Sequence, residues 1–190
     1  MKTSHKTLGI LGGMGPYATT MFMNNIMDLT PAKKDWEHVR MIVDNNPHIP
    51  SRSRALLYQE TSPVSAMIES CEKLQTYPVD FIAIPCNSAC FWIDEVRKKV
   101  KVPVLNILEI ASKALIRKND QIKNVLVLGG AVTAQKRIYH RHLEPFGATQ
   151  IILPEDDEQK VIQFFYGAVL WDLYSFTSAA AKSNYFRELR

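Results

Sequence analysis

The sequence predicts an α/β protein made of two similar small domains, each a parallel sheet with flanking helices, with a ligand cleft between them. Short apolar runs alternate with longer segments of helical periodicity, which is typical of parallel strands joined by crossover helices. A strand, a glycine-bearing turn and a helix at residues 7–29 recur weakly from Val125 through Gly129 and Gly130. This echo predicts the second domain, and a cleft between two such domains is a usual place for a ligand.

Strands are expected where the apolar runs are short, and helices where a longer amphipathic period is visible. The predicted strands are residues 7–11, 39–44, 81–85, 104–106, 125–128 and 150–153. The predicted helices are residues 16–29, 62–76, 88–100, 107–118, 134–145 and a last one from 158 onward. Most of the strands are apolar at successive positions, so we expect helices on both faces of the sheets.

The boundary between the two predicted domains falls near residues 106–110. Residues 1–106 are the expected first domain and residues 107–190 the second, which looks incomplete at its C-terminus because its sheet lacks a strand. A sheet missing a buried strand exposes an edge and apolar surface. Two explanations stay open: the 190 residues are a fragment of a longer protein, which we prefer, or a natural truncation removed the end.

Composition narrows the possible functions. The 190 residues are 46% hydrophobic and 22% charged, and 23 basic residues are interleaved with 19 acidic ones, so no nucleic-acid partner is expected. No apolar run approaches the ~18 residues needed to cross a membrane, so no membrane partner is expected either. Three cysteines form neither a disulfide set nor a zinc pattern, which favours a cytoplasmic protein with free thiols and without a bound metal.

The first motif is the turn from Gly12 to Pro16, with the sequence Gly-Gly-Met-Gly-Pro, between a buried strand and a helix. Glycines allow a tight turn, and backbone N–H groups at a helix start can bind a carboxylate or a phosphate. The spacing of the glycines is not that of a dinucleotide-binding fingerprint. An anion-binding turn that includes Met14 and Gly15 and a purely structural turn are both compatible with this motif.

The second motif is residues 85–90, with the sequence Pro-Cys-Asn-Ser-Ala-Cys, after an apolar strand and before a helix. Cys86 is therefore expected at the carboxyl end of a parallel strand, where reacting groups of open α/β sheets usually lie. A cysteine at a helix start is typical of reactive thiols, which act as bases or nucleophiles. We interpret Cys86 as catalytic, and Cys71 and Cys90 as packing residues.

The third motif is residues 44–52, a polar loop that leaves the second strand and contains two prolines. It ends at Arg52, and a guanidinium held by a stiff loop is suited to a bidentate grip on a carboxylate. A solvated surface arginine is the competing interpretation.

A basic cluster falls within the predicted helix 134–145. It is expected to form one solvated helix face, because two histidines two residues apart diverge on a helix and make a poor metal site. Its members are Lys136, Arg137, His140, Arg141 and His142.

Taken together, the three motifs resemble those of the aspartate/glutamate racemases that work without pyridoxal phosphate, in the Asp/Glu/hydantoin racemase superfamily. The resemblance continues through residues 103–105, 125–133 and the helix of Tyr139. It implies two similar α/β domains around one active site, a small carboxylate or amino-acid substrate, no cofactor and a homodimer.

The resemblance also implies roles for individual residues. Family members use two cysteines on opposite sides of the substrate Cα, one removing a proton and the other returning one. Cys86 matches the first of these cysteines, and Arg52 matches a carboxylate clamp. The expected substrate-binding residues are Met14, Gly15, Arg52, Asn87, Ser88 and Thr133.

The sequence departs from the family pattern at four places. Cys90 stands where a histidine is usual, Gly130 where a threonine is usual, and Leu170 where a lysine commonly holds a substrate carboxylate. The family's second cysteine has no counterpart before Arg190.

Three functions follow from this pattern. The leading one is an amino-acid racemase of the aspartate/glutamate type that moves the Cα proton with a cysteine thiol. An isomerase or decarboxylase that needs one cysteine is an alternative. A degenerate racemase fold that only binds a small acid or a partner is the other alternative, favoured by the departures.

Overall fold

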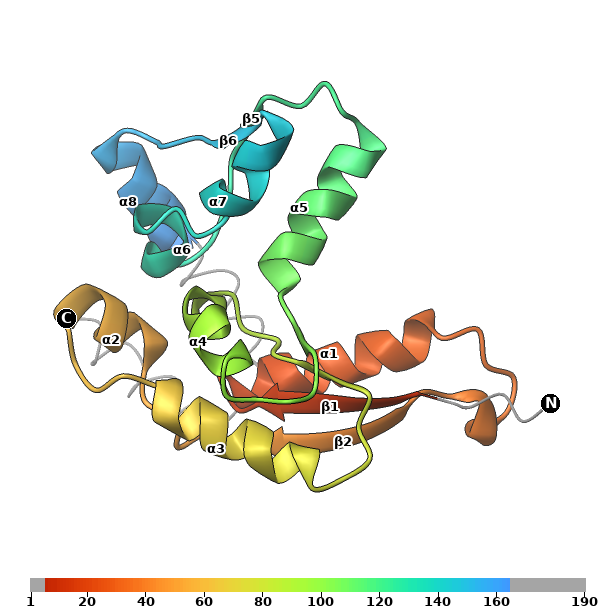
Figure 1. The fold of residues 1–190 in the computed structure, drawn as a ribbon. Helices are drawn as coiled ribbons and strands as arrows, with labels where there is room; N and C mark the ends of the chain where they lie inside the picture. The colour runs from red at the N-terminus through yellow and green to blue at the C-terminus, as the bar shows by residue number, and fades with distance from the viewer. Residues whose placement is uncertain (1–5, 165–190) are drawn as a thin grey trace.

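A computed structural model describes residues 6–164 of the chain. The first half contains one parallel sheet with strand order β2-β1-β3-β4, and the second half contains a smaller parallel sheet of β5 and β6. Figure 1 shows the two sheets in separate parts of the molecule, joined through helix α5. The strands are β1 (Thr7–Gly12), β2 (Arg40–Asn45), β3 (Phe81–Ala83), β4 (Val104–Leu105), β5 (Asn124–Val125) and β6 (Thr149–Gln150).

The first sheet is apolar on both faces, as its sequence predicts. Alternate residues of a strand point to opposite faces, and Leu8 and Ile10 of β1 pack in one cluster while Leu11 packs in another. In β3, Ala83 pairs with Ile10 and joins its cluster, and Ile82 joins the opposite one. Two core layers therefore lie back to back across the sheet.

Helices cover both of these faces. Phe22, Met23 and Ile26 of α1 pack against the Leu8 face, whereas Met67 and Cys71 of α3 pack in the cluster of the opposite face. Figure 1 accordingly shows α1 and α3 on opposite sides of β1 and β2. The helices of this half are α1 (Pro16–Leu29), α2 (Arg52–Tyr58), α3 (Val64–Gln75) and α4 (Ile93–Arg97), with short 3-10 turns η1 (Asp35–Glu37) and η2 (Ser88–Trp92).

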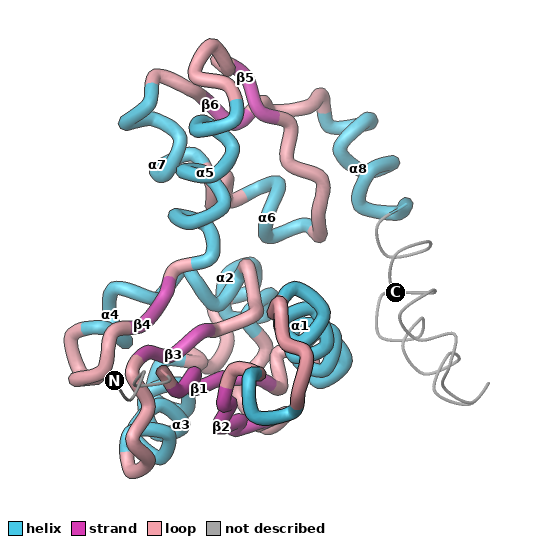
Figure 2. Tube along the Cα trace, turned by 90° about the vertical axis from the view of Figure 1, so that its right-hand side faces the viewer, coloured by secondary structure: helices cyan, strands magenta, loops and turns pink. Residues whose placement is uncertain are grey.

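The second half is smaller and its sheet is less covered (Figure 2). Ile116 of α5 and Leu143 of α7 form a small core with Ala148, and Val125 of β5 packs against it. The elements are α5 (Ile107–Lys118), α6 (Ala131–Gln135), α7 (His140–Leu143), η3 (Glu144–Phe146) and α8 (Glu155–Phe164).

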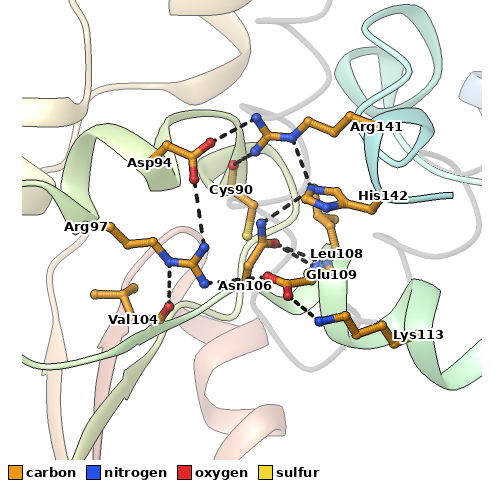
Figure 3. A network of polar contacts seen from close by, with 10 residues as sticks. All are labelled: Cys90, Asp94, Arg97, Val104, Asn106, Leu108, Glu109, Lys113, Arg141 and His142. Carbon is orange, nitrogen blue, oxygen red and sulfur yellow. Dashed lines mark hydrogen bonds and ion pairs between the residues drawn. The ribbon is translucent and has the colours of Figure 1, made fainter. Parts of the chain in front are cut away.

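A polar network joins the two halves (Figure 3). Arg141 of α7 donates to Asp94 of α4 at 3.2 Å and to the carbonyl of Cys90 at 3.3 Å. His142 Nε2 lies 3.4 Å from Asn106 Nδ2. Asn106 also caps α5, because its Oδ1 accepts from two backbone N–H groups of the first helical turn.

The predicted fold class is confirmed: the protein is α/β, with parallel sheets flanked by helices. The predicted bounds of helices 16–29 and 107–118 are confirmed as well. Helix α2 was not predicted, although Ser51 followed by helix-forming residues was a visible start signal, and the Ser51 side chain accepts from Arg54 N.

Four predicted elements were wrong in extent. The strands expected at 125–128 and 150–153 are each only two residues long, and Leu128 and Ile152 are 62% and 64% exposed. Helix 88–100 is a 3-10 turn followed by the five-residue α4. Helix 134–145 is interrupted because Arg137 adopts a left-handed backbone with φ of +46°, so the basic cluster does not form one helix face.

Within the part of the chain that the structure describes, none of the helices has the length and apolar character required to cross a membrane. Leu170, the expected site of a family lysine, lies outside the described residues.

Candidate active site

The three sequence motifs follow three neighbouring strands of the first sheet. The turn from Gly12 follows β1, the loop from Asn45 follows β2, and Cys86 lies shortly after β3. These strands are parallel neighbours in the order β2-β1-β3, so the three segments leave the sheet at its same carboxyl edge. Met14, Ile49 and Cys86 accordingly belong to or pack against one apolar cluster.

Cys86 is a free thiol of intermediate burial. Its Sγ lies 3.5 Å from Ser88 Oγ, a distance at which the hydroxyl can donate to a thiolate. The thiol is thus partly accessible and has a polar neighbour on its own loop.

The other two cysteines lie in different surroundings. Burial raises the pKa of Cys71 to about 12 and that of Cys90 to about 11. Cys90 Sγ donates to the carbonyl of Cys86 at 3.4 Å, which steadies the loop. Both therefore stay protonated at neutral pH, and both differ from Cys86 in being fully buried.

The glycine turn is held by its own helix. Thr19 Oγ1 accepts from Gly13 N at 3.0 Å and donates to Gly15 O at 3.0 Å. Gly13 has φ of +88°, and a Cβ there would collide with the backbone of Asn46. The turn is therefore locked against the loop after β2, with Met14 buried beneath it.

The sequence predicts Arg52 in a loop, but in the structure Arg52 is the first residue of α2. Its Nη1 donates to the carbonyls of Ile49 and Pro50 at 3.1 and 3.0 Å. Its Nε is buried and has no hydrogen-bond partner among the described residues. A buried donor without a partner is costly, and a substrate carboxylate is one group that could satisfy it.

Asn87 connects the Cys86 loop to the second half. Its Oδ1 accepts from Tyr139 Oη at 3.0 Å. Burial raises the pKa of Tyr139, so this phenol stays a donor at neutral pH. The family resemblance includes the helix of Tyr139, but sequence spacing does not reveal this contact because Tyr139 lies 52 residues from Asn87.

Thr133 is buried in α6, and its carbonyl accepts from Gln150 Nε2 at 3.2 Å. Helix α6 contacts α2, the helix of Arg52, and its Val132 joins the cluster that contains Met14. The structure thus brings Met14, Cys86 and α6 into one packed region. Within residues 6–164, neither Arg52 nor Thr133 forms a hydrogen bond with Cys86.

Between residues 6 and 164, no three side chains of His, Cys, Asp or Glu converge closely enough to hold a metal ion.

The family of the chain follows from its sequence. The family described as Asp/Glu/Hydantoin racemase matches residues 11–164. The chain belongs to the Asp/Glu/hydantoin racemase family. This racemase-family chain is 31% identical over 166 residues to the broad specificity amino-acid racemase RacX of Bacillus subtilis (strain 168), covering 85% of the chain and 70% of that protein.

Solved structures agree with this assignment. The aspartate racemase of Picrophilus torridus superposes with a TM-score of 0.75 at 30% identity, covering 90% of the racemase-family chain and 72% of its own. The glutamate racemase of Campylobacter jejuni subsp. jejuni superposes with a TM-score of 0.56 at 15% identity, covering 85% and 67%. The second likeness shows the fold alone. The resemblance inferred from the three motifs is confirmed.

Proposed function

We propose that the protein is an amino-acid racemase of the aspartate/glutamate type that moves the substrate Cα proton with the Cys86 thiol and needs no cofactor. The observation that carries the proposal is the position of Cys86. It is a free, partly accessible thiol at the carboxyl edge of a parallel sheet, beside the Ser88 hydroxyl and the two other motif segments.

In the first step, the Cys86 thiolate takes the Cα proton of the amino acid. The Cα–H bond breaks, an S–H bond forms, and the electron pair is delocalised into the substrate carboxylate. The Ser88 hydroxyl stabilises the thiolate before the transfer by donating to Sγ. Asn87 is held by Tyr139 so that its amide can contact the substrate.

Arg52 would hold the carboxylate that receives this electron pair. Two backbone carbonyls fix its Nη1, which leaves the buried Nε without a partner. A carboxylate bound there would satisfy Nε and place its negative charge against the guanidinium. Met14, Gly15 and Thr133 would complete the walls of the substrate site.

Inversion requires a second acid on the opposite face of Cα. Of the three cysteines in the sequence, Cys71 and Cys90 are fully buried, so neither thiol is accessible to a substrate. Two alternatives to the racemase proposal therefore stay open. If an acid–base group acts on only one face of the substrate Cα, the protein would be an isomerase or decarboxylase. If no such group acts on either face, it would be a degenerate racemase fold that binds a small acid or a partner.

The test is proton NMR of amino acids incubated with the protein in deuterated water, L-aspartate and L-glutamate first. We expect loss of the Cα proton signal, and chiral chromatography should detect the D form. Cys86→Ala should abolish both. Cys71→Ala is the matched control, because it removes a thiol in α3 and should leave exchange unchanged.

The outcomes separate the alternatives. Exchange that depends on Cys86 but gives no D form would mean that proton transfer occurs on only one face of the substrate Cα. No exchange with any amino acid, by a protein that melts cooperatively, overturns the racemase proposal and leaves the binding alternative.

We also propose that the protein is a cytoplasmic homodimer, as the family resemblance implies. Light scattering coupled to size exclusion would measure the mass in solution. A monomer over the micromolar range would contradict the dimer.

A further inference from the structure

A pocket lies at the junction of the two halves, and Cys86 is not among the residues that line it. Its volume is about 210 Å³. The apolar part of its lining is Phe91 of η2, Leu108 at the start of α5, and Ile138 before α7. None of the proposed substrate-binding residues lines it. Drug-sized ligands occupy about 300–1,000 Å³, so this pocket suits a smaller molecule.

The remaining lining is basic: Lys136, Arg137, His140 and Arg141. None of the residues that line the pocket is acidic. Arg141 is compensated outside the pocket by its ion pair with Asp94 (Figure 3). Lys136 and Arg137 have no carboxylate partner among residues 6–164, so the pocket keeps an excess of positive charge.

Arg137 is the most informative member. Its Nη2 has three neutral neighbours: Gln150 O at 3.0 Å, Thr149 Oγ1 at 3.2 Å and His140 Nδ1 at 3.3 Å. Its Nε is buried and has no partner in the described part of the chain. A half-buried guanidinium without an anion is unfavourable, and a bound anion would compensate it.

His140 offers a further donor. A guanidinium can only donate, so Nδ1 of His140 accepts from Arg137 and a neutral ring carries its proton on Nε2. No partner of Nε2 is recorded among residues 6–164. The turn that sets these side chains contains Arg137 with φ of +46°, a conformation that is unfavourable for a non-glycine residue and is concentrated at functional sites.

We propose that this pocket binds a small organic anion, with a phosphate or carboxylate group against Lys136, Arg137 and His140 and a ring-sized apolar body against Phe91, Leu108 and Ile138. The pocket is lined by both halves, so the ligand bridges them. The lining includes neither Cys86 nor the proposed substrate-binding residues, so the inference does not rest on the proposed reaction.

The probe is phenyl phosphate, titrated into the full chain and followed by calorimetry and by saturation-transfer NMR. Inorganic phosphate has the anionic group without the ring, and benzyl alcohol has the ring without the anionic group. Each should bind at least about tenfold more weakly than phenyl phosphate, since one hydrogen bond to a charged group changes affinity by about that factor. Cys86→Ala should bind phenyl phosphate like the parent protein, because Cys86 does not line the pocket.

Arg137→Asn removes the cation and keeps a residue that tolerates the left-handed backbone, and we expect about tenfold weaker binding. Lys136→Ala should weaken binding by about threefold, and its side chain has no recorded contact whose loss would unfold the protein. Lys118→Ala is the matched control, because Lys118 lies ten residues after Leu108 on α5, about 15 Å along the helix, and should change affinity less than twofold.

The proposal is overturned if phenyl phosphate does not saturate by about 10 mM, an affinity weaker than that of a millimolar ligand. It is also overturned if benzyl alcohol binds as well as phenyl phosphate, or if Lys118→Ala and Lys136→Ala weaken binding equally. Variants that fail to melt cooperatively are replaced by Lys136→Ala, which then decides the outcome.

Discussion

Both halves of the molecule combine a parallel sheet with helices, but the first sheet is larger and more completely covered than the second. The first sheet has β1 between two neighbours and helices on both faces. The second sheet pairs two strands of two residues, and Leu128 and Ile152 beside it are mostly exposed. Substitutions in the buried first sheet should therefore lower the free energy of unfolding more than substitutions in the lightly covered second sheet. Matched substitutions in the two halves can measure this difference.

The largest difference is expected between Gly13→Ala and Gly147→Ala. Both glycines have positive φ, +88° and +68°. At Gly13 a Cβ also collides with the Asn46 backbone, whereas at Gly147 the nearest atom is Lys123 Nζ at 3.8 Å. We expect a loss of about 4 kcal/mol at Gly13, from left-handed strain plus overpacking, and about 1 kcal/mol at Gly147.

Urea denaturation of both variants checks this prediction. Equal losses would mean that the contact between the glycine turn and the loop after β2 adds nothing to the strain of the backbone.

The next difference compares one substitution in the two sheets. Ile82 of β3 is fully buried, and Ile151, directly after β6, is 39% exposed. Ile82→Ala should cost about 3 kcal/mol of unfolding free energy and Ile151→Ala less than about 1 kcal/mol, because the first leaves a cavity in a packed core. Chemical denaturation followed by circular dichroism measures both, and a larger loss at Ile151 would contradict the comparison.

A smaller effect is expected at the contact between the halves. Arg141 and Asp94 form an ion pair at 3.2 Å, with side chains 48% and 59% exposed. Exposed pairs contribute about 0.2–1 kcal/mol, so a double-mutant cycle of Arg141→Gln and Asp94→Asn should give a coupling free energy in that range. A coupling above about 2 kcal/mol would show that the halves depend on this pair far more than an exposed ion pair allows.

The smallest expected effect is a pH dependence at His142. Burial, then the Arg141 charge, lower the pKa of His142, although Glu109 and Asp94 oppose this and Arg97 adds to it. Arg141 Nε donates to His142 Nε2 at 3.1 Å, and Asn106 Nδ2 faces the same nitrogen. Since Asn106 Oδ1 is occupied by the α5 cap, this ring nitrogen must accept.

Because the folded pKa is below the unfolded one, the unfolded chain binds the proton more readily. The stability that the neutral His142 ring contributes is present above the ordinary pKa of about 6.5 and is lost as pH falls below it. Thermal denaturation at pH 7.5 and 5.5 should therefore show a loss of stability that is smaller in His142→Gln, whose amide oxygen still accepts. If His142→Gln loses as much stability between pH 7.5 and pH 5.5 as the parent protein does, His142 is not the cause of the pH dependence.

In the first half, β1 and α1 are predicted correctly because their signals are local, whereas α2 is missed and helix 88–100 is too long. Strand β1 and helix α1 follow from an apolar run, glycines and a proline at the first helical position, all within residues 7–29. The placement of Cys86 after a buried strand followed in the same way. In the second half the same kind of signal overestimated strands and helix, because Val125 pairs but Leu128 does not, and Arg137 interrupts the expected helix.

By itself, the sequence determined the α/β class, the racemase family and the position of Cys86 at a strand end, since these depend on residues close together in the chain. The tertiary structure alone decided the Tyr139–Asn87 contact, the Arg141–Asp94 pair and the basic pocket. The Tyr139–Asn87 contact joins residues 52 positions apart, and the Arg141–Asp94 pair joins residues 47 positions apart. Periodicity carries no information about such pairs, because they form only when the two halves pack together.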